Sequence, residues 1–203
     1  MVESFKSIDG YANVYVICRF DECVIINPSH SFHEITNYIG GRTIKGIFIT
    51  ETTRITIDQI GYYDATIYMT QSQYNSLKSN SILGYNNIIK EPFDYLLLKH
   101  FIIDDDFKCS LADYQLKPHL IKGSRLDILA IQITNHLFIG GLIKNNNLAQ
   151  KARYKGAIYD YKKSLKELMG LDKNLMIYSN FDKPKTLVDT ISNNHLIKKW
   201  LNE

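Results

Sequence analysis

The segment IFITETTRITIDQIG, residues 47–61, concentrates polar side chains immediately after an apolar, strand-like run. A carboxylate can act as a general base or bind a metal ion, whereas a threonine hydroxyl is a poor zinc ligand beside imidazole or carboxylate. Histidine and cysteine, the usual zinc ligands, do not occur in the segment. Its candidate polar residues are Glu51, Thr53, Arg54, Thr56 and Asp58.

Histidines elsewhere in the chain do not have the spacing of a zinc motif. His30 and His33 could share one face of a helical turn and bind a metal with Cys23 nearby. Two exposed histidines at a helix start are the commoner arrangement, so we expect no metal there. The six histidines are His30, His33, His100, His119, His136 and His195.

The remaining reactive groups favour structural roles. Cys18 and Cys109 lie in apolar strand patterns and lack a flanking charge pattern that would lower the thiol pKa, so we expect buried thiols. The run Asp104–Asp106 lacks the spacing and the glycine of an EF-hand loop, which favours a solvated turn. The sequence also has no glycine-rich phosphate loop, no G-x-S-x-G elbow and no C-x-x-C pair.

The first half of the chain alternates strand and helix patterns. Two β-branched runs separated by Asp21 and Glu22 predict a hairpin. Ser31 is a candidate helix cap, and Gly40 is expected to close that helix. The predicted elements are strands 13–20, 23–27, 46–50 and 65–69 and helices 32–39 and 71–79.

The second half follows a turn-rich stretch, Asn80 to Pro92, and starts with strands. The stripe of Leu196, Ile197, Trp200 and Leu201 predicts core packing, with a dimer contact as the alternative. Strand and helix alternation in 203 residues predicts mixed α/β layers in one domain, residues 1–203. The predicted elements are a hairpin of strands 95–103 and 107–110, a second hairpin of strands 126–133 and 136–139, helix 159–169, strand 174–178 and helix 185–201.

An ordered series of landmarks resembles the metallo-β-lactamase superfamily, especially its small glyoxalase II-like hydrolases. That resemblance implies a four-layer αβ/βα sandwich with two mixed β-sheets flanked by helices. Segment 47–61 is similar to the family's strand, T-H-x-H-x-D-H motif and helix. The other landmarks are Asn27-Pro28-Ser29 for D-P-G, residues 116–124 for the second histidine segment, residues 137–141 for L-F-T-G-D and residues 179–182 for P-G-H-G.

In this resemblance, the family's metal ligands fall on residues that bind metals poorly. Only Glu51 has a strong donor, while His119 and Asp182 lie one residue away from lost ligands. We expect the mapped positions to converge at strand ends and to bind no metal or cofactor. We also expect a polar or salt-bridged plug formed by Glu51, Arg54, Asp58 and Asp182. The mapped positions are Glu51, Thr53, Ile55, Thr56, Leu120, Gly141 and Phe181.

The resemblance thus implies a degenerate, catalytically inactive protein that acts by binding a ligand or partner. One alternative is a hydrolase with an altered site that uses Glu51, Asp58 or His119. A second alternative is a binder of an anionic partner such as nucleic acid, because twelve Lys and Arg residues face six Asp and Glu residues from Lys144 onward.

Charge spacing and composition limit the partners that we expect. The basic residues have the spacing of a solvated helix face, so nucleic acid is less favoured than a protein or small molecule, and a homodimer stays open. The chain has no apolar run of about 20 residues and no signal-like start, and its three cysteines are irregularly spaced. We therefore expect no membrane contact, reduced cysteines and a cytoplasmic location. The basic residues are Lys151, Arg153, Lys155, Lys162, Lys163 and Lys166.

Overall fold

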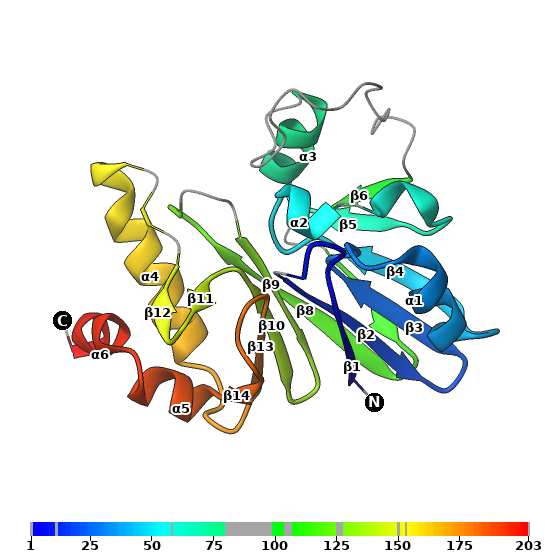
Figure 1. Ribbon diagram of the computed structural model, residues 1–203. Helices are drawn as coiled ribbons and strands as arrows, with labels where there is room; N and C mark the ends of the chain where they lie inside the picture. Colours follow the sequence, from blue (N-terminus) through cyan, green and yellow to red (C-terminus); the bar gives the residue numbers. More distant parts are fainter. Residues whose placement is uncertain are drawn as a thin grey trace. The chain divides into compact units, whose positions relative to one another are not determined.

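The computed structural model divides the chain into two compact units, Met1–Gln115 and Leu116–Glu203, and each unit is described by itself (Figure 1). Asp58, Asn80–Pro92, Asp104–Asp106, Arg153 and the side chain of Ile55 lie outside the described part of the chain, so predictions on them stay predictions. The single domain predicted from length also stays a prediction. The structure describes residues 2–10, 12–57, 59–79, 99–103, 107–124, 128–149, 151–152 and 154–202.

The first unit contains a mixed sheet in the order β1-β2-β3-β4-β5-β6. Its first three strands pair antiparallel, and β3 to β6 pair parallel. The predicted hairpin is therefore confirmed as β2 and β3. The strands are β1 (Val2–Lys6), β2 (Asn13–Arg19), β3 (Glu22–Ile26), β4 (Thr43–Phe48), β5 (Ile67–Met69) and β6 (His100–Ile102).

The helices of this unit bury an apolar stripe against one face of the sheet. Ile35, Ile39 and Leu77 from two of the helices belong to one core cluster with residues of β2 to β5. Helices were predicted at both positions; Ser31 is the N-cap residue of the first, but its side chain makes no cap hydrogen bond. The helices are α1 (Phe32–Ile39), α2 (Arg54–Ile57), the 3-10 helix η1 (Ile60–Tyr62) and α3 (Gln71–Lys78).

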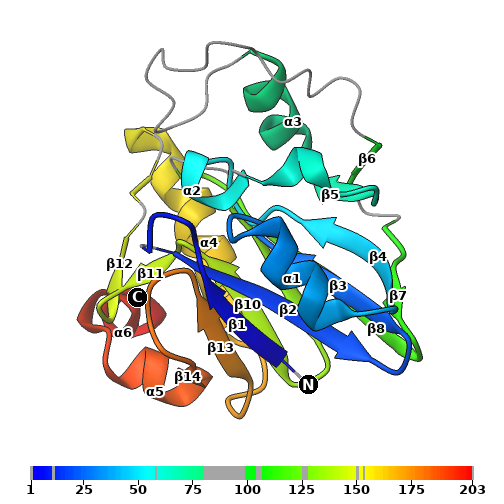
Figure 2. The same ribbon diagram turned by 45° about the vertical axis from the view of Figure 1, so that its right-hand side comes forward.

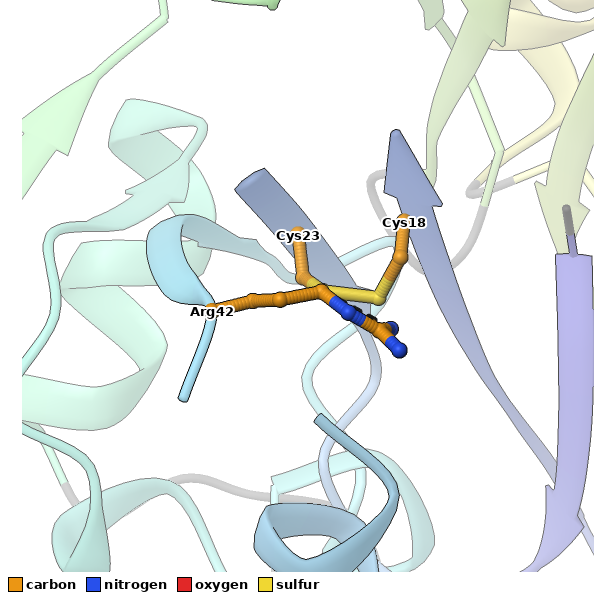
Figure 3. The surroundings of a disulfide bond; sticks show 3 residues. All are labelled: Cys18, Cys23 and Arg42. Atoms are coloured by element: carbon orange, nitrogen blue, oxygen red, sulfur yellow. Dashed lines mark hydrogen bonds between the residues drawn. A yellow bond between two sulfur atoms is a disulfide. The ribbon is translucent and has the colours of Figure 1, made fainter. Parts of the chain in front are cut away.

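Cys18 and Cys23 form a disulfide across the β2–β3 hairpin (Figure 3). The two residues are register partners in the antiparallel pair, with their Cα atoms 4.1 Å apart, so folding of the hairpin brings the sulfurs together. Arg42 lies beside the bridge, with Nη1 3.9 Å from Sγ of Cys23. The prediction of a free thiol at Cys18 and of reduced cysteines is thus wrong for this pair, whereas Cys109 is free.

The second sheet has the order β14-β13-β10-β9-β8-β7, and only β10 and β13 pair parallel within it. The hairpin predicted around Thr134 and Asn135 is confirmed as β9 and β10. The strands are β7 (Ser110–Leu111), β8 (Tyr114–Ile121), β9 (Ile128–Ile133), β10 (His136–Gly140), β13 (Met176–Ser179) and β14 (Lys185–Thr186), beside a separate ribbon of β11 (Ile143–Lys144) and β12 (Asn147–Leu148).

The hairpin predicted for strands 95–103 and 107–110 is wrong. β6 pairs parallel with β5 in the first sheet, and β7 instead pairs with the first two residues of β8. Local apolar runs cannot reveal this, because the partner of β6 lies about thirty residues earlier in the chain. The sequence analysis also missed β8 as a strand.

The helices of the second unit lie on one side of β9, β10 and β13 in both views (Figures 1 and 2). Tyr161, Leu165 and Ile197 join residues of these strands in the second core cluster. The predicted core role of the C-terminal stripe is confirmed for Ile197, Trp200 and Leu201, whereas Leu196 is exposed. The helices are the 3-10 helix η3 (Lys155–Ala157), α4 (Ile158–Met169), α5 (Leu187–Ser192) and α6 (His195–Asn202).

The single helix predicted over residues 185–201 is wrong, because it starts as a strand and is interrupted. The Thr186 hydroxyl accepts a hydrogen bond from the Asp189 amide and starts α5. Asn194 then caps α6, since its Oδ1 accepts a hydrogen bond from the Ile197 amide at 2.9 Å. Among the helices of the described residues, none has the length and apolar character to cross a bilayer.

Candidate functional site

The first half of the mapped site lies at the adjacent carboxyl ends of β3 and β4. Asn27 ends β3 with a positive φ of 56°, which asparagine tolerates better than most residues. Its Nδ2 donates to Thr50 Oγ1 at 2.6 Å, and its Oδ1 accepts from the Thr50 amide at 2.9 Å. Both side chains are fully buried, so this pair of bonds fixes the start of segment 50–57.

Thr53 and Thr56 use their polar atoms to shape the loop that enters α2. The Thr56 hydroxyl donates to the Glu51 carbonyl at 2.5 Å and accepts from the Thr53 amide at 3.0 Å. The same oxygen is 3.1 Å from Thr53 Oγ1. This oxygen therefore satisfies the amide and carbonyl groups of a tight turn, as side chains at helix starts do.

Glu51 and Arg54, both predicted for a polar plug, differ in burial. Glu51 is only 2% exposed, whereas Arg54 lies on the exposed side of α2. Asp58 is outside the described residues, and Asp182 belongs to the other unit. The plug itself thus stays a prediction, because the hydrogen bond from Thr56 reaches the backbone carbonyl of Glu51 and not its carboxylate.

Residues His119 and Leu120 lie inside β8. Leu120 is 37% exposed and faces Leu129 in the antiparallel register, so it lies within the strand and not after its end. The His119 Nε2 atom is 3.3 Å from Gln132 Oε1 on β9. Burial lowers the pKa of His119, which favours the neutral imidazole. Ser124 follows the strand, fully buried, and its hydroxyl donates to the Ile121 carbonyl.

Gly141 and Phe181 follow the ends of β10 and β13, two parallel neighbours. Gly141 is buried and has no side chain to donate. The Phe181 ring is covered by the ammonium group of Lys144, whose Nζ lies 4.7 Å from the ring centroid. A cation over an aromatic face is a favourable contact that would be lost if the ring turned to another partner.

Asp182 holds the turn of the β11–β12 ribbon. Its carboxylate accepts hydrogen bonds from the amides of Asn145 at 2.8 Å and Asn146 at 3.4 Å, and it pairs with Lys185 at 3.3 Å. Both asparagines have positive φ, as the primed turns of tight hairpins require. The sequence analysis missed this role, although the run Asn145–Asn147 is a recognised turn signal.

His30, a second candidate for metal binding, already has a partner at each ring nitrogen. Its Nδ1 contacts the Lys6 carbonyl, and its Nε2 lies 2.5 Å from the Glu34 carboxylate. This arrangement leaves no ring nitrogen for a metal. In the described parts of the chain, no three His, Cys, Asp or Glu side chains are grouped so that they could hold a metal ion.

The chain matches no protein-family model and no curated protein sequence. Solved structures, in contrast, are similar to it over nearly its whole length. BLEG-1 B3 metallo-β-lactamase has a TM-score of 0.80 at 12% identity and covers 97% of this chain and 99% of its own. The metallo-β-lactamase from Staphylococcus aureus subsp. aureus COL has a TM-score of 0.72 at 16% identity, covering 100% of this chain and 63% of its own. TTHA1623 in a di-iron-bound form has a TM-score of 0.65 at 16% identity, over 91% and 94%.

The chain has the metallo-β-lactamase fold. The predicted αβ/βα class with two mixed sheets flanked by helices is therefore confirmed. Sequence identities of 10–16% establish the fold alone. The mapped positions divide into Glu51, Thr53 and Thr56 in the first unit and Leu120, Gly141 and Phe181 in the second, so their convergence stays a prediction.

The residues at the mapped positions do not fit the di-metal centre of this fold. Leu120 and Phe181 have no donor atom, Gly141 has no side chain, and the Thr56 oxygen already serves the backbone. Zinc sites need three or four strong nitrogen, sulfur or carboxylate donors, and here Glu51 alone supplies one. This conclusion applies to the mapped positions, and their assignment as ligand positions stays a prediction.

Proposed function

We propose that this protein is a non-catalytic member of the metallo-β-lactamase fold that acts by binding a partner. The observation that carries the proposal is the chemistry of the mapped positions, which supply one strong donor where the fold's hydrolytic centres need several. A cation that deprotonates water near neutral pH must be held by several strong ligands and keep an open coordination position. The proposal is supported further by the use of Thr56 and Asp182 in backbone turns.

The burial of Glu51 also argues against hydrolysis by a metal-independent general base. A catalytic base must reach a proton on the substrate or on an attacking water. Only 2% of Glu51 is accessible, and the adjacent threonine hydroxyls hold the loop that carries it. Burial of the Glu51 side chain therefore supports the non-catalytic proposal over a metal-independent hydrolase.

The test of this proposal is a hydrolysis assay on purified protein with a generic thioester and a β-lactam, each with and without added zinc or iron. We expect turnover equal to that of the buffer in every condition. Glu167→Ala is the control, because Glu167 is an exposed carboxylate on α4. Metal-dependent hydrolysis that disappears in Glu51→Ala but persists in Glu167→Ala would overturn the proposal. Metal-independent hydrolysis lost in Glu51→Ala would instead establish the altered hydrolase.

A further inference from the structure

The two units carry opposite net charge. Residues 116–203 contain fifteen Lys and Arg against seven Asp and Glu, a net charge of +8, whereas residues 1–115 contain nine against fourteen, a net charge of −5. The overall charge of +3 hides this separation. A strongly basic unit attracts anionic partners and raises their local concentration.

Part of the basic charge is gathered on one face of α4 and its leading turn. Lys155, Tyr159, Lys163 and Lys166 follow one another at intervals of four, four and three residues, which places them along a single helix face. All four are exposed, and the ring of Tyr159 is 74% accessible. We call these four residues the α4 face; it extends over about 16 Å at the helical rise per residue.

Two acidic residues of α4 border this face. Asp160 is three residues before Lys163 and Glu167 is four residues after it, the spacings at which helical side chains are neighbours. None of the salt bridges between described residues involves Lys155, Lys163 or Lys166. The α4 face therefore has three lysines beside two carboxylates, without a salt bridge between them among the described residues.

The opposite side of α4 fixes the face toward the outside of its unit. Tyr161, Leu165 and Leu168 are buried in the second core cluster, so the helix cannot rotate without exposing them. In Figure 1, α4 and α6 both lie on the outer side of the second sheet. Lys162 lies over the Trp200 ring of α6 at 5.3 Å, and the exposed Lys198 and Lys199 belong to the same helix.

We propose that the α4 face binds single-stranded nucleic acid, which deepens the proposed function by naming the partner class. The lysine ammonium groups would contact successive phosphates, and the exposed Tyr159 ring would stack on an unpaired base. Tyr154, 66% exposed, offers a second ring immediately before Lys155. Spacing along the sequence favoured a solvated helix face, but the net charge of +8 of residues 116–203 and the exposed tyrosine between the lysines fit a nucleic-acid strand better.

Other anionic partners use less of this surface. A duplex hides its base faces, which leaves no stacking partner for Tyr159. A membrane-binding helix needs exposed Leu, Phe or Trp side chains for insertion, and the α4 face has none. An acidic peptide could pair with the lysines but would leave the tyrosine rings unused. The contacts do not involve the sugar, so RNA and DNA strands are expected to bind equally.

The test is fluorescence anisotropy of the full chain with labelled oligouridylate and oligothymidylate over a range of salt concentrations. The double variant Lys163→Glu/Lys166→Glu is expected to abolish most binding. The double variant Lys163→Gln/Lys166→Gln is expected to reduce the magnitude of the slope of log K against log salt concentration by about 1.4, because two phosphate contacts are lost. Tyr159→Ala should weaken binding about tenfold, whereas Tyr159→Phe should retain it. Lys117→Glu/Lys183→Glu, with the same change in net charge at exposed sites away from α4, is the matched control.

Each outcome decides the inference separately from the proposed function. The inference would be overturned if the α4 variants and the control variant lost binding equally. It would also be overturned if polyphosphate without bases, an acidic peptide or anionic vesicles bound as tightly as the oligonucleotides, or if no oligonucleotide bound at low salt. Circular dichroism of every variant checks that α4 remains folded. Failure here with no hydrolysis leaves the non-catalytic proposal standing, whereas metal-dependent cleavage of a bound oligonucleotide would overturn that proposal and keep the binding surface.

Discussion

Gly123 occupies a position that backbone conformation and packing restrict to glycine. It has a φ of 77°, and a Cβ atom at this position would lie 2.4 Å from the Ala157 carbonyl oxygen and 2.8 Å from the Tyr161 amide. The turn after β8 therefore packs directly against the start of α4. Because only glycine fits both the backbone conformation and the space, this landmark of the fold needs no catalytic explanation.

The first prediction is that Gly123→Ala lowers the free energy of unfolding by about 3 kcal/mol. About 1–2 kcal/mol comes from the left-handed backbone, and overpacking against α4 adds a similar amount. Gly41→Ala is the control, since no atom lies within 4 Å of its added Cβ and its φ is not positive. Urea unfolding of both variants measures the difference, and equal stability of the two would contradict this account of the turn.

His119 gives a second prediction, on pH. Burial lowers the pKa of His119 in the folded protein, so the unfolded chain binds the proton more readily. Its contribution to stability is complete above the unfolded pKa of about 6.5 and is lost as pH falls toward the lowered folded pKa. His119→Gln should therefore flatten the decline of the urea midpoint below about pH 6.5. The exposed His33→Gln serves as the control, and parallel curves for all three proteins would refute the assignment.

At the scale of elements, local patterns succeeded where neighbours in sequence are also neighbours in space. The hairpins β2–β3 and β9–β10 and the helices α1, α3 and α4 are examples, because each is defined by its own periodicity and turn residues. β8 escaped notice because Lys117, Pro118 and His119 interrupt the apolar alternation. β6 depends on a distant partner, which no local pattern contains, whereas the break between α5 and α6 has a local signal in the capping residue Asn194.

Asn194 explains the break between α5 and α6 and gives the third prediction. Its Nδ2 donates to the Asn146 carbonyl at 2.7 Å, while its Oδ1 caps α6, and the side chain is 1% exposed. Asn194→Ala should lower the free energy of unfolding by about 2–3 kcal/mol, because a cap is lost and a buried carbonyl loses its partner. Asn193→Ala is the matched control, since Asn193 is exposed. A similar urea midpoint for the two variants would contradict the proposed cap.

For the whole molecule, the fold follows from the two apolar cores and not from a metal site. The first cluster consists mainly of buried Ile and Val side chains, and the second mainly of Ile and Leu. Packing of these apolar side chains needs no metal ion, and the resulting fold is similar to that of a B3 metallo-β-lactamase at 12% identity. The sequence predicted the fold class from ordered landmarks, and the donor chemistry at Leu120, Gly141 and Phe181 could be read from the residues alone.

Contacts within the candidate site could not be predicted in the same way. The sequence indicated polar groups at Thr56 and Asp182, but the hydrogen bonds that commit them to turns depend on backbone geometry. Asp182 reaches amides 36 and 37 residues earlier in the chain, a distance over which pairwise sequence patterns carry no signal. The disulfide, in contrast, has a local signal, because Cys18 and Cys23 are five residues apart and flank the turn of the predicted β2–β3 hairpin.

The most direct test of the central claim is a calorimetric titration of zinc into metal-stripped protein, combined with thermal unfolding at saturating zinc. We expect only weak zinc binding to surface groups and no rise in Tm. A zinc ion bound specifically to the native state, at a concentration about a hundredfold above its Kd, would instead add about 2.7 kcal/mol of stability and raise Tm. Stoichiometric zinc binding tighter than micromolar, with a raised Tm that Glu51→Ala abolishes and Glu167→Ala preserves, would contradict the account.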